Sequence, residues 1–319
     1  MKSISTALAV SLFCLLPCKG GTYNNEYRPT HDTLTVTFTG DVLLDRGVRR
    51  VIESAGGSPD SLFTPAVDSL FARSQVVVAN LECPATKVCS PVFKRFTFRA
   101  EPEWLPSLRR HGITHLNLAN NHSIDQGRRG LMDTRRNIAA AGMTPVGADS
   151  TMDAASQPVL LNPSPSGLRR RVWLLSSVRM MLENFAYLDD RPSVSQEPMD
   201  TLLQRVARLR REDPAAAIIV CLHWGGEHTL KPIPAQRADA RRLIDAGADA
   251  IVGHHTHTMQ TVETYRGRAI YYSIGNFIFD QHRPLNSRAA LATLTITADT
   301  VTARTTHIDI RRCVPHIED

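Results

Sequence analysis

Short apolar runs alternate with amphipathic stretches along most of this chain, and the apolar runs share one kind of ending. Five of them read as strands, at residues 33–40, 75–80, 115–119, 217–222 and 250–253. Each ends on side chains that can bind a metal, which are in order Asp41, Glu82, Asn120-Asn121-His122, His223 and His254-His255-Thr256-His257. Open α/β sheets gather their polar site residues at the carboxyl ends of the strands. The pattern therefore predicts an α/β fold with a metal centre at a sheet edge.

The segments between these runs extend the alternation. Helices are predicted at residues 60–72, 102–111, 130–141, 199–212 and 236–246. A strand is predicted at 171–176, a strand or β-like extension at 93–99, and an antiparallel set closing the fold at 268–273, 289–297 and 301–310. The least patterned stretch, 178–198, is typical of a lid or substrate loop.

The amino terminus has the features of a targeting segment. A short positive start precedes the apolar stretch 4–16, which predicts a secretory signal over residues 1–18. Residues 19–31 read as a polar tether and 32–319 as a single domain. Cys18 resembles the cysteine of a bacterial lipobox, except that a proline precedes it, so either lipid anchoring at Cys18 or plain export is expected. We expect an exported protein, periplasmic or at the cell surface.

Composition and charge indicate which kinds of binding partner the chain is expected to have. With 42% hydrophobic and 21% charged residues, the 319-residue chain is typical of globular proteins. The net charge of +6 comes largely from arginine clusters at 169–171, 205–211 and 241–242. Each cluster alone is typical of a solvated face, whereas together they favour a polyanionic partner. The chain has no nucleic-acid-binding motif and no aromatic-rich basic stripe, so nucleic acid is not expected.

Two cysteines lie close together beside a predicted site residue. Cys83 and Cys89 are six positions apart in a loop of an expected exported protein, which predicts a local disulfide. That bond would brace the loop carrying Glu82. Zinc binding by the pair is less favoured, because no second cysteine pair is nearby.

The polar residues at the strand ends differ in how specifically they indicate a metal. Three histidines within residues 254–257 are rarely all structural, because residues two apart on a tight loop can point into one cavity. His223 alone is equally consistent with a structural role, and Asp41 with a turn or helix cap. Carboxylate, amide and imidazole donors together suit one or two ions of Mn, Fe, Zn or Co. His122, as an imidazole outside the ligand set, is expected to act as general acid.

Six motifs in order give the sequence a specific resemblance. They are Gly40-Asp41, Asn80-Leu81-Glu82-Cys83-Pro84, residues 119–127, His223-Trp224-Gly225-Gly226-Glu227, residues 253–260 and residues 272–277. From about residue 34 to residue 280, the chain resembles the bacterial poly-gamma-glutamate capsule biosynthesis protein family (CapA/PgsA type). That family looks like a divergent branch of the calcineurin-like metallophosphoesterases. The resemblance implies a four-layer α/β/β/α sandwich with a metal centre at the strand ends.

The resemblance also implies roles for individual residues. The metal positions would be Asp41, Glu82, Asn121, His223, His255 and His257, with His122 as the catalytic residue near the leaving group. Substrate contacts would come from Glu227, His254 and Asn276, and from Arg99 as a bidentate donor to a carboxylate.

The sequence departs from the ordinary phosphoesterase pattern in ways that concern the metals. Leu43 stands where that pattern has a histidine, and Asn80-Leu81-Glu82 replaces its second acidic motif. One of two metal subsites is therefore expected to be weakened or lost. Thr256 replaces a common proline, and residues 176–188 lack the expected Thr/Asn-rich signature.

Two hypotheses about function follow. The first is an exported metal-dependent hydrolase or transferase acting on an anionic envelope polymer, a γ-linked glutamyl chain such as poly-gamma-glutamate. The ligand set serves amide and phosphoester cleavage equally, and a simple phosphomonoesterase is a minor variant. The second is a non-catalytic accessory or anchoring subunit of a polymer synthesis and export complex. Leu43 favours the second hypothesis, and the retained imidazoles favour the first.

Overall fold

The computed structural model describes residues 33–162, 168–180, 190–281 and 283–318. The predicted signal segment 1–18 with Cys18, the tether 19–31 and the centre of the predicted lid loop, 181–189, lie outside the described residues. From His31 onward the chain forms one compact unit. None of the described helices combines the length and the apolar character needed to cross a membrane.

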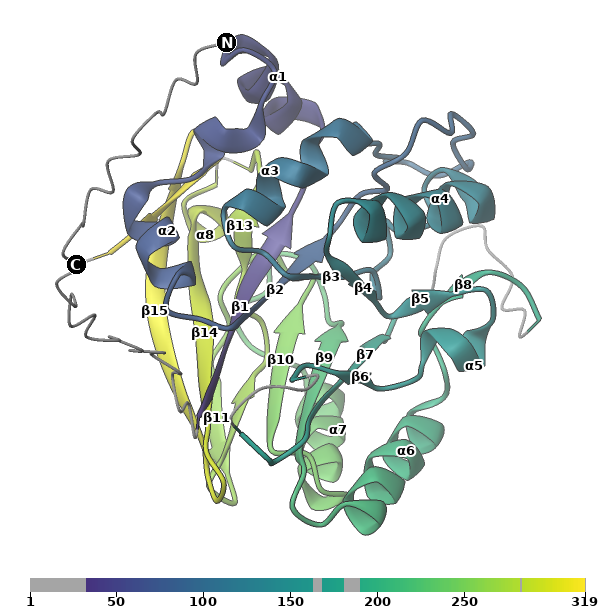
Figure 1. Ribbon diagram of the computed structural model, residues 1–319, viewed down its shortest axis with the longest axis vertical. Helices are drawn as coiled ribbons and strands as arrows, with labels where there is room; N and C mark the ends of the chain where they lie inside the picture. The colour runs from purple at the N-terminus through teal and green to yellow at the C-terminus, as the bar shows by residue number, and fades with distance from the viewer. Residues whose placement is uncertain (1–32, 163–167, 181–189, 282, 319) are drawn as a thin grey trace, which may run out of the picture. The chain divides into compact units, whose positions relative to one another are not determined.

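Two β-sheets stacked face to face form the centre of this unit (Figure 1). In the described part of the chain, one sheet has eight strands: β16 (Val314–Ile317), β15 (Val301–Arg311), β14 (Arg288–Ile296), β1 (Leu34–Val42), β2 (Val76–Leu81), β3 (His115–Asn117) and β4 (Thr144–Val146) in that order, with β13 (Asn276–Ile278) beside the end of β1. The other has six: β11 (Val262–Tyr265), β12 (Arg268–Tyr271), β10 (Ala250–His254), β9 (Ala217–His223), β7 (Val172–Val178) and β6 (Val159–Leu160). A small ribbon pairs β5 (Ala148–Asp149) with β8 (Ser193–Val194).

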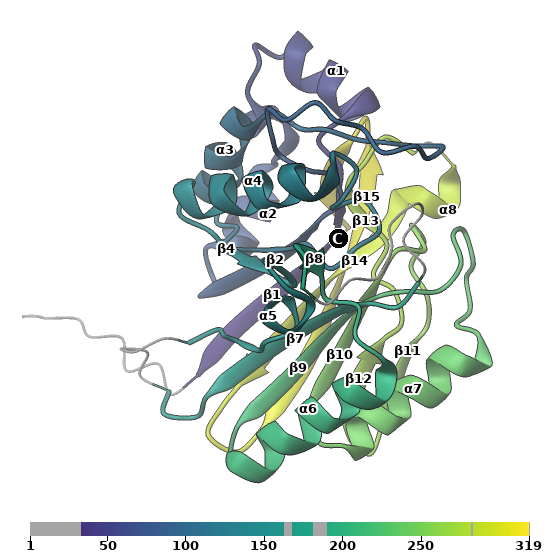
Figure 2. The same cartoon turned by 90° about the vertical axis from the view of Figure 1, so that its right-hand side faces the viewer.

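Helices cover the outer face of each sheet (Figure 2). Over the eight-stranded sheet lie α1 (Arg46–Ser54), α2 (Pro65–Phe71), α3 (Leu105–Arg110) and α4 (Gly127–Ala140), with 3-10 turns at Pro59–Leu62 and Pro102–Trp104. Over the six-stranded sheet lie α6 (Met199–Glu212) and α7 (Pro234–Asp245). The short helices α5 (Met152–Ala155) and α8 (Pro284–Ser287) lie in connections. The layers confirm the predicted α/β/β/α sandwich.

Three apolar clusters hold the layers together. One lies between the eight-stranded sheet and its helices, and includes the fully buried Leu43 and Leu116. The second fills the space between the sheets, where Phe38 of one sheet meets Ile219 of the other. The third packs α6 and α7 on the six-stranded sheet. Because apolar burial stabilises by about 25 cal/mol per Å², these clusters fix the sheets against each other and hence the positions of their ends.

Parallel pairing sets where the strands end. β1, β2 and β3 run parallel, with Asp41 level with Asn80 and Asn80 level with Asn117. β9 and β10 also run parallel, with His223 level with His254. The carboxyl ends of each set therefore meet at one edge of its sheet, as the sequence pattern requires.

Several predicted elements differ in detail. The helix predicted at 60–72 is divided into the 3-10 turn and α2, because Thr64 caps a new helix whose first residue is Pro65. No strand forms within residues 93–99, since the Phe98 amide donates to the Asp125 side chain instead of a neighbouring strand. The strand predicted at 268–273 does not join the closing antiparallel set. It is β12, which pairs with β10 and β11 in the other sheet.

Candidate metal centre

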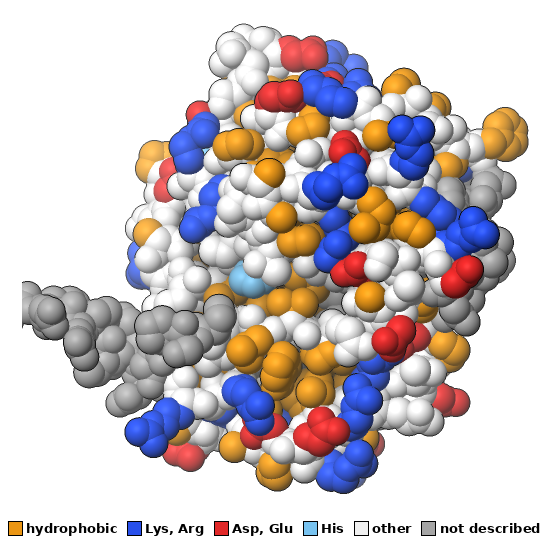
Figure 3. Space-filling view, turned by 45° about the vertical axis from the view of Figure 1, so that its right-hand side comes forward, with side chains coloured by type: hydrophobic (Ala, Val, Ile, Leu, Met, Phe, Trp, Pro, Cys, Tyr) orange, Lys and Arg blue, Asp and Glu red, His pale blue; other side chains and the backbone are white. Residues whose placement is uncertain are grey.

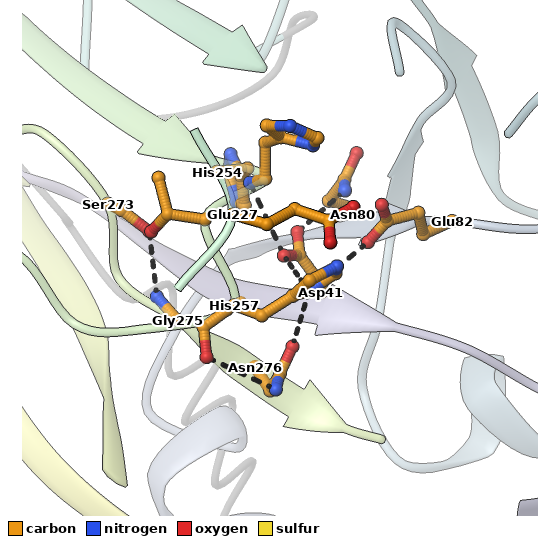
Figure 4. A network of polar contacts seen from close by, with 12 residues as sticks. Asp41, Asn80, Glu82, Glu227, His254, His257, Ser273, Gly275 and Asn276 are labelled. Carbon is orange, nitrogen blue, oxygen red and sulfur yellow. Dashed lines mark hydrogen bonds and ion pairs between the residues drawn. The ribbon is translucent and has the colours of Figure 1, made fainter. Parts of the chain in front are cut away.

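The strand ends of both sheets deliver the predicted ligands to one place, and Figure 4 labels three of them, Asp41, Glu82 and His257. Asp41 comes from β1, Glu82 directly follows β2, and Asn121 lies in the loop after β3. His223 ends β9, and His255 and His257 follow β10. Five of these six residues are buried, and Asn121 is partly exposed.

Glu82 is shared by two groups of ligating atoms. It joins His223 and His255 in one group and Asp41 and His257 in the other, with the atoms of each group within 4.8 Å of one another. Glu82 Oε1 lies 3.5 Å from His223 Nε2, and Oε2 lies 4.0 Å from His257 Nδ1. Each carboxylate oxygen thus faces a different group, which is the arrangement of a carboxylate between two cation positions.

The carboxylate of Glu82 shows that these residues fit a metal. Both of its oxygens are buried, and neither has a hydrogen-bond partner among the described residues. Burial and the neighbouring Asp41 raise the pKa of Glu82 well above its ordinary value. An unpaired buried carboxylate is strongly disfavoured unless a cation or hydrogen bonds compensate it. A divalent ion in either group would supply that compensation.

The imidazoles of the first group are in the form that binds metals. His223 Nε2 lies 2.8 Å from Asn121 Oδ1 and 3.1 Å from His255 Nδ1. Burial lowers the pKa of His223 well below its ordinary value and that of His255 to about 4. Both rings are therefore neutral at physiological pH, as ligation requires. Asn121, His223, His255 and Glu82 together offer four donors, which suits Mn, Fe or Zn.

The second group has fewer donors. Its members are Asp41, Glu82 and His257. Although burial lowers the pKa of His257, the charges of Glu82 and Asp41 raise it to about 9. A proton on this ring thus partly neutralises the carboxylates in the metal-free protein. Leu43 is fully buried in the apolar cluster under the helices and adds no donor, so this group is the weaker cation position.

Asparagine side chains orient the ligands from behind. Asn80 donates to Asp41 Oδ1 at 2.8 Å, and its own Oδ1 accepts from Asn117 at 3.0 Å and Asn120 at 3.1 Å. Asn276 Oδ1 lies 3.0 Å from His257 Nδ1. Partners of this kind fix ligand rotamers and tune metal affinity. The sequence motifs contain Asn80, Asn120 and Asn276 but not Asn117, and no periodicity assigns any of them this role.

His122 is held by a buried ion pair that the sequence did not indicate. Its Nδ1 lies 2.8 Å from Asp125 Oδ2, and Lys94 Nζ lies 2.7 Å from Asp125 Oδ1. Lys94 also donates to the Asn121 carbonyl at 2.9 Å, and Phe98 packs on the His122 ring at 4.3 Å between centroids. The arrangement leaves Nε2 of His122 as the nitrogen available for proton transfer.

Strained backbone conformations and close backbone packing occur around the candidate metal centre. Of seven non-glycine residues with left-handed backbone in the described ranges, four lie around the centre: Arg46 (φ 51°), His228 (φ 60°), His255 (φ 93°) and His257 (φ 56°). Gly253 lets the end of β10 approach its neighbour, since a Cβ there would lie 2.0 Å from the Tyr272 carbonyl oxygen. Non-glycine strain of this kind persists where surrounding structure enforces it, often at functional sites.

The residues predicted to contact substrate fall into two groups. Glu227 has a half-exposed side chain that points toward the cluster, and Asn276 lies against His257 (Figure 4). His254 lies behind the centre, with Nε2 3.0 Å from the Thr39 carbonyl and Nδ1 3.6 Å from the Cys221 thiol. Arg99 is tied to other protein groups, donating to the Thr86 carbonyl at 3.1 Å and pairing with Glu101 at 3.3 Å.

The predicted disulfide between Cys83 and Cys89 is wrong. Both are free thiols, Cys83 buried and Cys89 exposed. The Cys83 sulfur accepts a hydrogen bond from the Leu44 amide at 3.4 Å and belongs to the core under the helices. Past this point the Thr86 side chain caps the Val88 amide and turns the chain outward. Burial raises the pKa of Cys83 far above its ordinary value, so this thiol is unreactive.

Comparisons with known proteins agree with the position of these motifs. Residues 35–281 match the family described as bacterial capsule synthesis protein PGA_cap. A PGA biosynthesis protein CapA of Bacillus subtilis is 32% identical over 252 residues, which cover 78% of this chain but only 64% of that relative's length. A probable polyglutamine synthesis accessory protein of Mycobacterium tuberculosis is 30% identical over 313 residues, covering 83% of this chain and 81% of that protein. A calcineurin-like phosphoesterase structure from Bacillus subtilis covers 90% of this chain and is itself covered to 88%, at 13% identity and a TM-score of 0.47, a likeness that carries no argument by itself.

Proposed function

This chain belongs to the bacterial capsule synthesis protein family PGA_cap, and on that premise we propose that it is an exported, metal-dependent hydrolase or transferase. Its substrate class would be an anionic envelope polymer such as poly-gamma-glutamate. The relatives named for PGA and polyglutamine synthesis support this substrate class. The observation that carries the proposal is the buried Glu82 carboxylate, whose two unpaired oxygens face two separate groups of ligating atoms.

The residues around the centre can each contribute to bond cleavage. Asn121, His223 and His255 with Glu82 would hold one ion, and Asp41 and His257 with Glu82 a weaker second one. A divalent ion bound there supplies Lewis-acid polarisation of an acyl or phosphoryl oxygen and favours ionised water. His122, oriented by Asp125, would donate a proton from Nε2 to the leaving group. Lys94 holds Asp125 in place through their 2.7 Å contact.

A non-catalytic accessory or anchoring subunit is the second candidate function. It is favoured by Leu43, which packs into the core and leaves the second group with three donors. The Mycobacterium relative is named as an accessory protein of polymer synthesis. In this case the chain would act in an envelope synthesis complex. In both cases we propose a location in the periplasm or at the cell surface, with Cys18 as the lipid-anchoring position if the protein is anchored.

Metal content per chain is the measurement that tests the proposal. The full chain, purified without chelators, is expected to carry one or two equivalents of Mn, Fe or Zn by elemental mass spectrometry. His255→Ala should lose metal with little loss of fold, because its loop contributes little to the core, whereas the matched control His307→Ala, an exposed histidine of β15, should retain it. His122→Asn should keep the metal and slow turnover of γ-glutamyl polymers or phosphoesters.

The outcomes separate the two functions. A folded protein that remains metal-free after reconstitution would contradict the enzyme and favour the accessory subunit. If His122→Asn lost its metal, His122 would have to be reassigned as a ligand. For anchoring, Cys18→Ala should move the protein from the membrane to the soluble fraction of the envelope; unchanged fractionation would leave plain export.

A further inference from the structure

Arg46 and His228 are the strained residues near the centre that the proposed metal site does not use, and of the two Arg46 carries a guanidinium. It begins α1 directly after Asp45, with left-handed backbone at φ 51°. This conformation is uncommon for a residue with a Cβ and marks a side chain whose direction is enforced. We propose that Arg46 binds a carboxylate of the substrate at the mouth of the metal centre. The inference rests on the proposed function for the identity of that substrate.

Two aromatic rings connect Arg46 to the centre. Its guanidinium carbon lies 5.1 Å from the Phe98 ring centroid and 5.6 Å from that of Phe279. Phe98 packs on His122 at 4.3 Å, and Phe279 packs on His257 at 4.6 Å. Arg46 is thus one ring away from the proposed proton donor and from a proposed ligand. Contact with two ring faces also restricts the guanidinium to one position.

The hydrogen-bonding capacity of this guanidinium is only partly used. Nη2 pairs with Asp280 Oδ1, while the other Asp280 oxygen accepts from the Gly47 amide at 2.9 Å. Nε is buried, and no acceptor among the described residues bonds it. The side chain is still 35% exposed, so a ligand can reach it. A guanidinium has five N–H donors, and one ion pair leaves donors for a second anion.

The neighbouring charges favour a carboxylate over a phosphate. Asp280 pairs with Arg46, and Asp41 and Glu227 lie near Glu82 in the centre, so a phosphate dianion would meet more repulsion from these carboxylates than a monoanion. The planar fork of arginine also matches a carboxylate in bidentate geometry. Arg99, the donor predicted from the sequence, is bound to Thr86 and Glu101 instead.

A broad cationic stripe would be another way to bind an anionic chain. The face that Figure 3 shows has no such stripe. Lys and Arg side chains are dispersed there among Asp and Glu. Dispersed pairs of opposite charge give little net attraction for a polyanion at physiological ionic strength. On that face no continuous cationic groove is available to an anionic chain, whereas Arg46 offers a single cation beside the centre.

Binding of γ-linked triglutamate to the full chain, measured by isothermal titration calorimetry, tests the proposal without requiring turnover. Arg46→Gln is expected to weaken binding about 10- to 100-fold, the range for loss of a charge-assisted hydrogen bond. Arg46→Lys should lie between this variant and the wild type. Arg50→Gln is the matched control, since Arg50 is an exposed arginine of the same helix, and should change binding less than about twofold.

One further variant and one further probe separate ligand binding from a purely structural ion pair. Asp280→Asn releases the guanidinium and should leave binding equal or tighter, whereas loss of binding equal to that of Arg46→Gln would overturn the proposal. So would unchanged binding in Arg46→Gln, or a wild type that binds inorganic phosphate but not triglutamate. A wild type that binds triglutamate through Arg46 but never cleaves the polymer would contradict the enzymatic function and support this site.

Discussion

Replacing Glu82 by glutamine should abolish the stabilisation of the protein by metal. The substitution keeps the shape of the side chain and removes the negative charge that both groups of ligands share. In the metal-free protein the wild-type carboxylate is buried with two unpaired oxygens. The variant avoids burying that charge, so metal-free Glu82→Gln is expected to be more stable than the metal-free wild type, by about 1–3 kcal/mol.

Metal should produce the opposite ranking. An ion present at 100 times its dissociation constant stabilises the folded state by about 2.7 kcal/mol. For a domain slightly larger than 150–250 residues, each kcal/mol shifts the melting temperature by about 2–4 °C. The wild type should therefore gain roughly 5–10 °C on addition of Mn²⁺ or Zn²⁺. The variant, without the shared carboxylate, should gain little or nothing.

Thermal melts followed by circular dichroism, with and without added metal, measure both effects. Glu227→Gln is the control, because Glu227 carries the same charge near the site but is half exposed, and its metal-induced shift should remain. A full shift in Glu82→Gln would refute the assignment of Glu82 as the shared ligand. A metal-free Glu82→Gln that melts well below the wild type would refute the reading of its carboxylate as an unpaired buried charge.

Four further predictions concern other parts of the molecule. Lys94→Met should slow turnover by at least about tenfold with metal content unchanged, because it removes the cation that holds the partner of His122; metal loss would contradict this. Asp249→Asn should cost about 3–5 kcal/mol in urea unfolding, since its nearly inaccessible carboxylate pairs with three arginines. Gly253→Ala should cost about 1–3 kcal/mol by the same assay, because its Cβ would overlap a carbonyl oxygen. Burial lowers the pKa of His115 from 6.5 to about 4. The stability that the neutral, buried ring gives to the folded state is therefore complete above pH 6.5 and is lost as the pH falls toward 4. His115→Gln should remove roughly 3 kcal/mol of this acid dependence, measured as unfolding free energy against pH.

The positions of the proposed ligands were accessible to sequence reasoning because they follow from strand periodicity. Asp41, Glu82 and His223 each come at the end of an apolar run, and parallel pairing brings such ends together. The sandwich follows from the same alternation of strands and helices. The division of the helix predicted at 60–72 also had a signal in the sequence, because Thr64-Pro65 is a helix start.

Contacts made by irregular segments were not accessible in this way. Lys94 reaches Asp125 only because the preceding loop folds back over the strand ends, and no periodicity encodes that path. Arg46 and Arg99 are both arginines beside a site motif. Only the structure shows that Arg46 keeps a donor without a partner among the described residues, whereas Arg99 is bound to Thr86 and Glu101. The disulfide prediction failed for the same reason, since spacing alone does not fix the directions in which Cys83 and Cys89 point.

The six proposed ligands are divided equally between the two sheets, and this has a consequence for assembly. Asp41, Glu82 and Asn121 lie in or after strands of the eight-stranded sheet, whereas the three histidines lie in or after strands of the other. Neither sheet alone presents a complete set, so high-affinity metal capture must follow docking of the two halves. Binding that requires the docked state stabilises that state by mass action. The ion would then cross-link the two sheets. The metal concentration in the compartment where the chain folds would determine how strongly the docked state is stabilised.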